Sequence, residues 1–292
     1  MGLPPVPGDR RPLRTLIDGQ ASGLIAATDR GLQYGDGIFT TLRVQRGMPV
    51  FLEDHLARLH RDAAQLFLPV PATRMLRREA LALAGELGDG VLKILWTRGP
   101  GGRGYQCPDP AIPCRILATY AMPDYPAELE RFGVGVGLSS VRLGHNEALA
   151  GAKHLNRLEQ VLARREWDGG EVREALMRDQ ADCVVEGVMS NLFLVQGGRL
   201  VTPLLDRCGV RGVMRQRVLR VAAELGIECR EGRFDLAAVL GADEVFLSNS
   251  LIGIWPVAEL AGRRFPVGPL TSLLRDRLHE QLADYLDAAC RA

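Results

Sequence analysis

The sequence predicts a chain of two α+β domains joined by a short linker, and three observations support this. The chain has 292 residues, and at about 100–200 residues per domain this length favours one large or two medium domains. Predicted strands outnumber predicted helices and do not alternate with them one for one, as they would in a doubly wound sheet. Two prolines fall within residues 122–126, which disfavours helix and interrupts strand pairing.

The expected domain boundaries follow from these patterns. We expect an N-terminal tail at residues 1–13, a smaller α+β domain at 14–121, a linker at 122–126 and a larger domain at 127–292. In the smaller domain, residues 53–67 and 73–87 carry apolar residues at helical spacing, and Gly88 follows as a stop signal. Residues 91–96 and 116–121 are short apolar runs that predict strands, separated by a loop rich in Gly and Pro.

The larger domain is predicted to contain more strands than helices. The predicted strands lie at residues 133–138, 175–177, 184–186, 192–195, 200–202 and 243–248. Predicted helices run over about 156–167, 212–225 and 272–290, and the first of these places Leu158, Val161, Leu162 and Trp167 on one side. The pair Gly197-Gly198 predicts a hairpin turn between two of the strands.

Composition and charge exclude several classes of protein. The chain is 47% hydrophobic and 24% charged, which fits a globular protein with a sizeable core and argues against disorder. Lys+Arg is 36 and Asp+Glu is 35, so neither a nucleic-acid partner nor an anionic membrane surface is expected. The longest uncharged stretch, residues 245–258, is too short and too polar to span a bilayer. The first residues have no apolar signal region, so the cytoplasm is the expected compartment.

Cysteine and histidine spacing predicts no metal site. The 6 cysteines are scattered without a Cys-x-x-Cys pair, and we expect them to be small buried or half-buried side chains. The 5 histidines show no His-Glu-x-x-His or comparable spacing, which disfavours a zinc enzyme.

The loop Arg98-Gly-Pro-Gly-Gly-Arg-Gly-Tyr105 invites comparison with phosphate-binding loops. It lacks the Gly-Lys-Ser/Thr ending of a P-loop and leads into Cys107-Pro-Asp-Pro instead of a helix. Two interpretations remain open. The segment is a flexible hairpin loop, or it is an arginine-bearing loop over an anionic substrate, because Arg98 and Arg103 lie on a backbone loosened by glycines.

Two further residues are candidates for cofactor chemistry. Lys153 by itself would usually be a solvated surface charge, but its small neighbours 150–152 let a planar ligand approach the amine, as a Schiff-base lysine requires. Glu186 ends a predicted strand and is followed by Gly187 and the pair Ser190-Asn191. It is either a turn residue or an anion that holds a protonated heterocyclic nitrogen of an electron-sink cofactor.

Five motifs in chain order resemble the class IV (branched-chain/D-amino-acid type) pyridoxal-phosphate-dependent aminotransferase family. They are Gln33-Tyr-Gly-Asp-Gly-Ile-Phe-Thr-Thr41, His55-Leu-Ala-Arg-Leu59, Lys153-His-Leu-Asn-Arg157, the segment from Glu186 through Asn191 to Phe193, and Gly209-Val-Arg-Gly-Val-Met-Arg215. The resemblance extends over about residues 14–260, nearly the whole chain.

This resemblance implies a fold-type IV architecture, a homodimer, and pyridoxal 5'-phosphate in the cleft between the two domains. Lys153 would form the internal aldimine, and Glu186 would pair with the pyridine nitrogen. Helix N-termini favour anions, and the residues that the resemblance assigns to the rest of the cofactor, chiefly its phosphate, are Arg58, Asn191, Ser250 and the backbone N–H groups of Val213 and Met214.

Within the family, some features look like a lyase branch more than a transaminase. They are the pair Thr40-Thr41, the 98–105 loop, Val141-Arg-Leu-Gly-His-Asn146 and the continuation of the Lys153 motif to Gln160. The implied reaction is C–O lysis of 4-amino-4-deoxychorismate to 4-aminobenzoate and pyruvate, a step toward folate. The substrate amine would displace Lys153 in an external aldimine, and the freed lysine would then remove a proton.

The resemblance also implies residues that contact the substrate. The Thr41 hydroxyl would assist proton transfer beside Lys153, although it could equally satisfy a strand partner. Two substrate carboxylates require cations, for which Arg103 is preferred over Arg98. Tyr34 and Tyr105 complete the expected substrate-binding set.

Two alternatives to the lyase stay open. A class IV transaminase acting on D- or branched-chain amino acids would share the cofactor motifs, so only Thr40-Thr41 and the 98–105 loop discriminate. A non-catalytic relative that kept the fold is the second alternative, and the presence of both Lys153 and Glu186 argues against it.

Overall fold

The computed structural model describes residues 11–167 and 172–289, which form two compact units. The first unit comprises the described residues up to Asp124, the short segment Lys153–Asn156 and the described residues from Asp284 onward. The second comprises Tyr125–Ala152 and the described residues of Arg157–Ala283. Most of the expected tail, residues 1–10, and the expected helix end at Cys290 lie outside the described residues.

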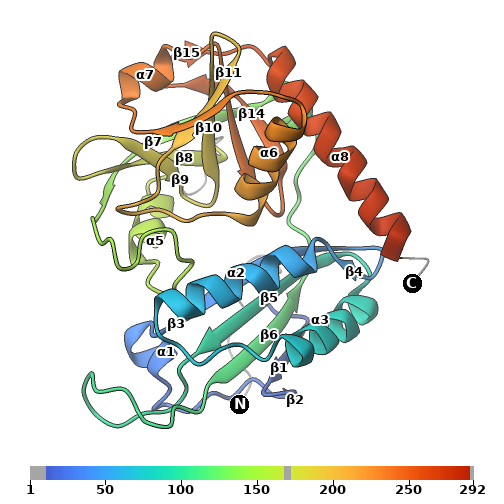
Figure 1. Cartoon of the computed structure of the whole chain (residues 1–292), viewed down its shortest axis with the longest axis vertical. Helices are drawn as coiled ribbons and strands as arrows, with labels where there is room; N and C mark the ends of the chain where they lie inside the picture. Colours follow the sequence, from blue (N-terminus) through green and yellow to red (C-terminus); the bar gives the residue numbers. More distant parts are fainter. Residues whose placement is uncertain (1–10, 168–171, 290–292) are drawn as a thin grey trace. The chain divides into compact units, whose positions relative to one another are not determined.

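The first unit is a six-stranded antiparallel sheet covered by helices. The strands lie in the order β2-β1-β6-β5-β3-β4, and α2 and α3 cover one face of the sheet (Figure 1). The elements are β1 (Arg14–Ile17), β2 (Gln20–Ala21), α1 (Arg30–Tyr34), β3 (Gly37–Gln45), β4 (Met48–Pro49), α2 (Leu52–Gln65), α3 (Thr73–Leu87), β5 (Gly90–Thr97) and β6 (Cys114–Tyr120).

Strand β3 separates the core of this unit from its candidate site. Side chains along a strand point alternately to opposite faces of the sheet. Ile38, Leu42 and Val44 are therefore buried in the same hydrophobic core as Leu56 and Leu59 of α2. The side chains of Phe39, Thr41 and Arg43 are half-buried on the opposite face.

Two segments from later in the chain are grouped with the first unit. Phe39 N–H donates to the carbonyl of Lys153, and Leu155 N–H donates to the carbonyl of Gly37, both at 2.9 Å. Near the end of the described chain, the Tyr285 hydroxyl donates to the carbonyl of Pro49 at 3.0 Å. The sequence analysis assigned residues 153–156 and the C-terminal segment to the larger domain at 127–292. The structure groups them with the first unit instead, because they form hydrogen bonds with β3 and β4, which are distant in the chain.

The second unit is built on a nine-stranded sheet that closes on itself. The order is β12-β11-β10-β13-β14-β7-β8-β9, with β15 on β14 and an additional pairing of β9 with β10. This last pairing closes a ring, which leaves its strands without an open edge. The elements are α4 (Ala127–Phe132), β7 (Val134–Leu143), α5 (Leu158–Arg165), β8 (Glu174–Asp179), β9 (Val184–Gly187), β10 (Asn191–Gln196), β11 (Arg199–Pro203), α6 (Val213–Glu224), β12 (Cys229–Gly232), α7 (Leu236–Leu240), β13 (Glu244–Asn249), β14 (Gly253–Leu260), β15 (Arg263–Arg264) and α8 (Pro269–Ala289).

Helix α5 packs on the closed sheet with its expected apolar side outward. The helix contacts β7 and β8, and its residue Ala163 is fully buried. Leu158, Val161 and Leu162 are 71%, 54% and 46% exposed. Three residues of the apolar side that the periodicity identified therefore face the surface of this unit, whereas the fourth, Trp167, is half-buried against Gly137 of β7.

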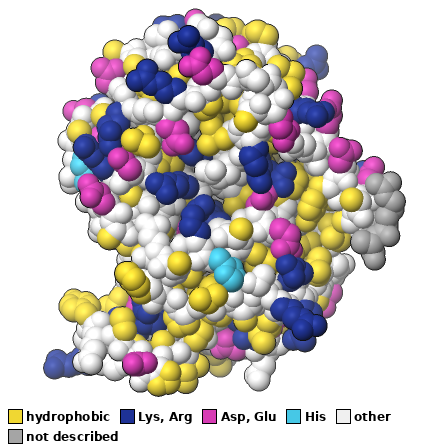
Figure 2. Space-filling view, viewed as in Figure 1, with side chains coloured by type: hydrophobic (Ala, Val, Ile, Leu, Met, Phe, Trp, Pro, Cys, Tyr) yellow, Lys and Arg dark blue, Asp and Glu magenta, His cyan; other side chains and the backbone are white. Residues whose placement is uncertain are grey.

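The surface, the helices and the cysteines add three findings. Basic, acidic and hydrophobic side chains are interspersed on the face seen in Figure 2. In the described part of the chain, no helix is long and apolar enough to cross a membrane.

Among the described cysteines, Cys107 is exposed, contrary to expectation, because it lies in the long loop between β5 and β6. The others are buried or half-buried.

Candidate active site

A buried arginine is held between α2 and β3 in the first unit. His55 and Arg58 are three residues apart on α2 and therefore lie on one side of the helix. The Thr40 hydroxyl lies 2.6 Å from His55 Nδ1 and accepts a hydrogen bond from Arg58. Arg58 Nη2 also donates to the carbonyl of Phe39 at 3.4 Å. A guanidinium that is only 5% exposed and oriented in this way is suited to bind an anion such as a phosphate.

The backbone of Lys153 is held on both sides. Its N–H donates to Asp62 Oδ2 at 2.9 Å, and its carbonyl accepts the bond from Phe39 described above. Asp62 is fully buried in α2. The Lys153 amine lies over the ring of Phe39, 4.6 Å from the ring centroid. Asp62 and β3 together therefore fix the backbone from which this amine extends.

A second lysine approaches the same aromatic ring. Lys93 of β5 lies directly opposite Thr41 of β3 in the strand register, and its Nζ is 4.9 Å from the centroid of Phe39. Lys93 and Lys153 are the only two lysines in a sequence with 36 basic residues. Burial lowers the pKa of the Lys93 ammonium. Thr41, Lys93 and Lys153 are thus gathered around Phe39.

Sequence reasoning missed Lys93, although a signal was present. The residue interrupts the apolar run at 91–96, where a half-buried charge is uncommon. Asp62 was also missed, because an acidic residue on an amphipathic helix gives no indication that it binds a backbone N–H group 91 positions away.

Arg98 has partners within the protein. Its Nε donates to Asp36 Oδ2 at 2.7 Å, and its other nitrogens donate to the carbonyls of Phe67 at 2.8 Å and Leu66 at 3.1 Å. Burial raises the pKa of Asp36, but hydrogen bonds from Arg98 and Arg30 outweigh it and hold that pKa below its usual value. Substrate binding by Arg98 stays a prediction, and these bonds weigh against it. Arg103, by contrast, is exposed.

The loop that carries Arg103 and Tyr105 is anchored by a buried arginine. Arg30 donates to the carbonyls of Gly104 at 3.1 Å, Tyr105 at 3.2 Å and Gln106 at 3.3 Å. The rings of Tyr34 and Tyr105 also meet edge to face, with centroids 5.5 Å apart. These contacts favour a loop of defined conformation over a freely flexible hairpin. The substrate contacts expected of Tyr34, Arg103 and Tyr105 stay predictions.

In the second unit, Glu186 lies where the sheet closes. It is the β9 residue that pairs with Asn191 of β10, and it is 4% exposed. Val210 connects the two side chains, since its N–H donates to Glu186 Oε2 at 2.8 Å and its carbonyl accepts from Asn191 Nδ2 at 2.8 Å. A buried carboxylate fixed in this way can hold a proton on a heterocyclic nitrogen.

The side-chain amide of Asn191 also positions the start of α6. Asn191 Oδ1 accepts a hydrogen bond from Gly212 N–H at 3.2 Å. Gly212 is the N-cap of α6, and no side chain caps the helix. The N–H groups of Val213 and Met214 are in the first turn, where the helix dipole favours an anion.

Two polar residues support the neighbouring loops. Glu174 is buried and accepts hydrogen bonds from Ser190 Oγ at 2.8 Å and from the N–H groups of Val188 and Met189, both at 3.1 Å. Burial, only partly offset by these bonds, raises the pKa of Glu174. Asn249 Oδ1 accepts from Leu251 and Ile252 N–H beside the half-buried Ser250.

Each unit by itself presents groups of the kinds that bind parts of pyridoxal 5'-phosphate. The first unit supplies a lysine amine and a buried guanidinium, and the second supplies a buried carboxylate and a helix N-terminus. An aldehyde, a phosphate and a pyridine nitrogen require these groups. The residue types in each unit are those of a pyridoxal-phosphate enzyme of fold type IV.

Comparison with known proteins agrees with this class. The family model Amino-transferase class IV matches residues 37–260, so the chain belongs to this family. It is 34% identical over 267 residues to "Aminodeoxychorismate lyase" of Vibrio harveyi, covering 90% of this chain and 98% of that protein.

Two solved structures are similar over most of the chain. The 4-amino-4-deoxychorismate lyase of Pseudomonas aeruginosa is 48% identical with a TM-score of 0.89, covering 92% of this chain and 99% of that one. The branched-chain amino acid aminotransferase of Escherichia coli is 26% identical with a TM-score of 0.81, covering 93% and 95%. The expected family, fold class and pyridoxal-phosphate cofactor are confirmed.

Proposed function

We propose that this chain is an aminodeoxychorismate lyase, which converts 4-amino-4-deoxychorismate to 4-aminobenzoate and pyruvate. The similarity to two lyases at 48% and 34% identity supports this activity. The observation that carries it is the group around Phe39, where a hydroxyl and a second ammonium accompany the lysine amine. Lysis requires proton transfer at a substrate that carries two carboxylates, and these are the groups that serve it.

The proposed roles of the cofactor residues follow from their contacts. Pyridoxal 5'-phosphate supplies an electron sink when bound. Lys153 holds it covalently and moves a proton at the substrate carbon that bears nitrogen. Glu186 keeps a proton on the ring nitrogen, and Asn191 fixes the segment that orients Glu186. The phosphate ligands are Arg58, the N–H groups of Val213 and Met214, and Ser250.

Product analysis separates the lyase from the transaminase alternative. Purified protein given 4-amino-4-deoxychorismate and no 2-oxo acid should release 4-aminobenzoate and pyruvate in equal amounts, because lysis returns the cofactor unchanged. Chromatography of both products measures this ratio. An absolute requirement for a 2-oxo acid acceptor, with no pyruvate from the substrate, would assign the chain to the transaminases instead.

Lys93 is our candidate ligand for a substrate carboxylate. It is half-buried opposite Thr41, and a bound carboxylate would stabilise its desolvated ammonium. A hydrogen bond to a charged group contributes about 1.5–3 kcal/mol, so Lys93→Met should raise KM roughly 10–100-fold and lower kcat less. Steady-state kinetics measures both parameters.

The matched control keeps the charge at the same position. Lys93→Arg should recover part of the lost affinity, and both variants should keep the visible colour of the cofactor because Lys153 is intact. An unchanged KM in Lys93→Met would contradict the assignment and leave Arg103 as the candidate.

We also propose that the chain forms a homodimer in the cytoplasm. The exposed apolar residues Leu158, Val161 and Leu162 of α5 offer a surface that a second copy could cover. Sedimentation velocity at several concentrations tests the dimer.

A further inference from the structure

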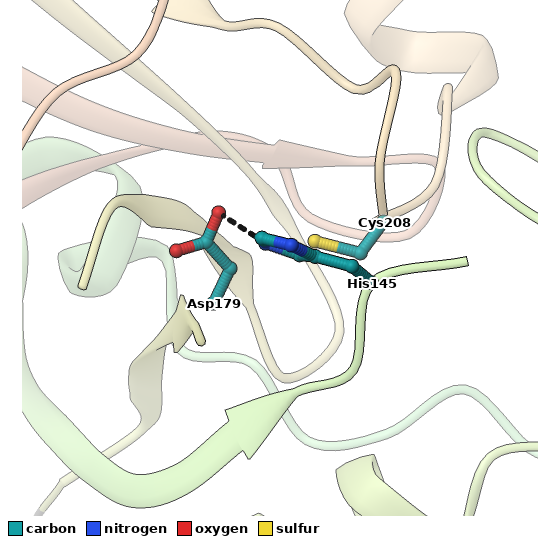
Figure 3. Close-up of side chains that lie close together, drawn as sticks. All are labelled: His145, Asp179 and Cys208. Atoms are coloured by element: carbon teal, nitrogen blue, oxygen red, sulfur yellow. Dashed lines mark hydrogen bonds and ion pairs between the residues drawn. The ribbon is translucent and has the colours of Figure 1, made fainter. Parts of the chain in front are cut away.

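Outside the residues assigned to the cofactor, three side chains capable of binding metal meet in the second unit. His145 follows β7, Asp179 ends β8, and Cys208 lies in the loop before α6. Figure 3 shows the Asp179 carboxylate directed at the imidazole of His145, with the Cys208 sulfur beside the same ring. One ligand atom from each residue lies within 4.8 Å of the other two.

We propose that His145, Asp179 and Cys208 form a binding site for a zinc-type divalent cation. Imidazole nitrogen, carboxylate oxygen and thiolate sulfur are the ligands that zinc takes in proteins, with bonds of about 2.0–2.3 Å. Ligand atoms around a tetrahedral zinc lie roughly 3–4 Å apart, so small side-chain rotations bring these three into range. Water completes the fourth position.

The carboxylate of the site is already fixed in place. The Asp179 side chain is 5% exposed, and its Oδ1 accepts hydrogen bonds from the N–H groups of Ala181 and Cys183, both at 2.9 Å. Its Oδ2 is left to face His145 Nε2, at 2.9 Å. Because the Asp179 side chain is already held in one conformation, less conformational entropy is lost when an ion binds.

The other two ligands are His145, which lies where an ion can enter from solvent, and Cys208, which supplies a sulfur atom. The His145 side chain is 28% exposed, so an ion reaches the site from solvent on this side. Cys208 is buried, and its sulfur binds an ion as the thiolate. Binding therefore breaks the S–H bond, releases the proton to solvent and forms the sulfur–metal bond without any change of oxidation state.

An ion at this position would act on structure and not on the reaction. Cys208 is two residues from Val210, whose backbone binds both Glu186 and Asn191. The ion would tie this loop to the end of β8. Because it binds only the folded state, it should raise the melting temperature of the protein.

Cobalt titration of the full-length protein with its cofactor tests the proposal. After chelator treatment, Co²⁺ should bind with a stoichiometry of one per chain and give the intense visible bands of tetrahedral cobalt, at longer wavelengths than the cofactor absorbs. Zn²⁺ should displace it and raise the melting temperature. Cys208→Ser should remove the sulfur-to-cobalt charge-transfer band, and His145→Ala should weaken binding roughly tenfold or more.

Two controls separate binding at this cluster from binding elsewhere and from a loss of folding. Cys229→Ser alters a half-buried cysteine of β12 outside the cluster and should leave Co²⁺ binding unchanged. The exposed residue His145 can be replaced without opening the core, so His145→Ala serves if Cys208→Ser does not fold. Absence of saturable Co²⁺ binding, or binding that survives every available ligand substitution, would overturn the proposal. Neither result depends on which reaction the enzyme catalyses.

Discussion

Lys153→Ala should remove the visible absorbance of the purified protein and lower lyase turnover by about 10⁴-fold or more. The amine both holds the cofactor and moves the proton, and proton transfer by a positioned side chain alone contributes about 10²–10⁴-fold. In the parent protein, borohydride should fix the cofactor to the peptide that contains Lys153. Absorbance spectra, peptide mass spectrometry and single-turnover assays measure these effects.

The small number of lysines makes this test unusually clear. Lys93 is the only other lysine in the sequence, and its amine lies 4.9 Å from the centroid of the same ring. Lys93→Met should keep both the colour and the borohydride adduct. An adduct on Lys93 in the parent protein would refute the assignment of Lys153.

Thr41→Val should lower kcat by about 10²–10⁴-fold, or roughly 3–5 kcal/mol of barrier. The substitution keeps the branched shape on β3 and removes only the hydroxyl, so the fold and the cofactor colour should survive. Thr41 is half-buried on the face of the sheet that also carries Phe39, where its hydroxyl can assist proton transfer by Lys153. Steady-state assays at saturating substrate measure kcat.

The neighbouring threonine is a matched control on the opposite face. The Thr40 hydroxyl contacts His55 and Arg58, so Thr40→Val should weaken cofactor retention and change kcat of the fully loaded enzyme little. If Thr41→Val instead keeps kcat within about twofold of the parent, Thr41 only satisfies a strand neighbour.

Local patterns in the sequence were sufficient for many elements. The predicted helix at 73–87 agrees with α3 (Thr73–Leu87), and the helix at 53–67 corresponds to α2 (Leu52–Gln65). Helical periodicity defines both helices because their apolar stripes pack on a sheet, and Gly88 marks the end of α3. Strand β3 was not predicted from its pattern, since two adjacent threonines, Thr40 and Thr41, interrupt the apolar residues at its centre.

The sequence by itself determined the family, the cofactor chemistry and the candidates Lys153, Glu186 and Arg58, since motif residues and their order are local features. Only the tertiary structure decided what each side chain contacts. It showed Arg98 bonded to Asp36, Lys93 beside Phe39, and Asp62 beneath the Lys153 backbone. The cluster of His145, Asp179 and Cys208 has no recognisable spacing in the chain. Such contacts join residues that are far apart in sequence, and they form only when sheets and helices pack.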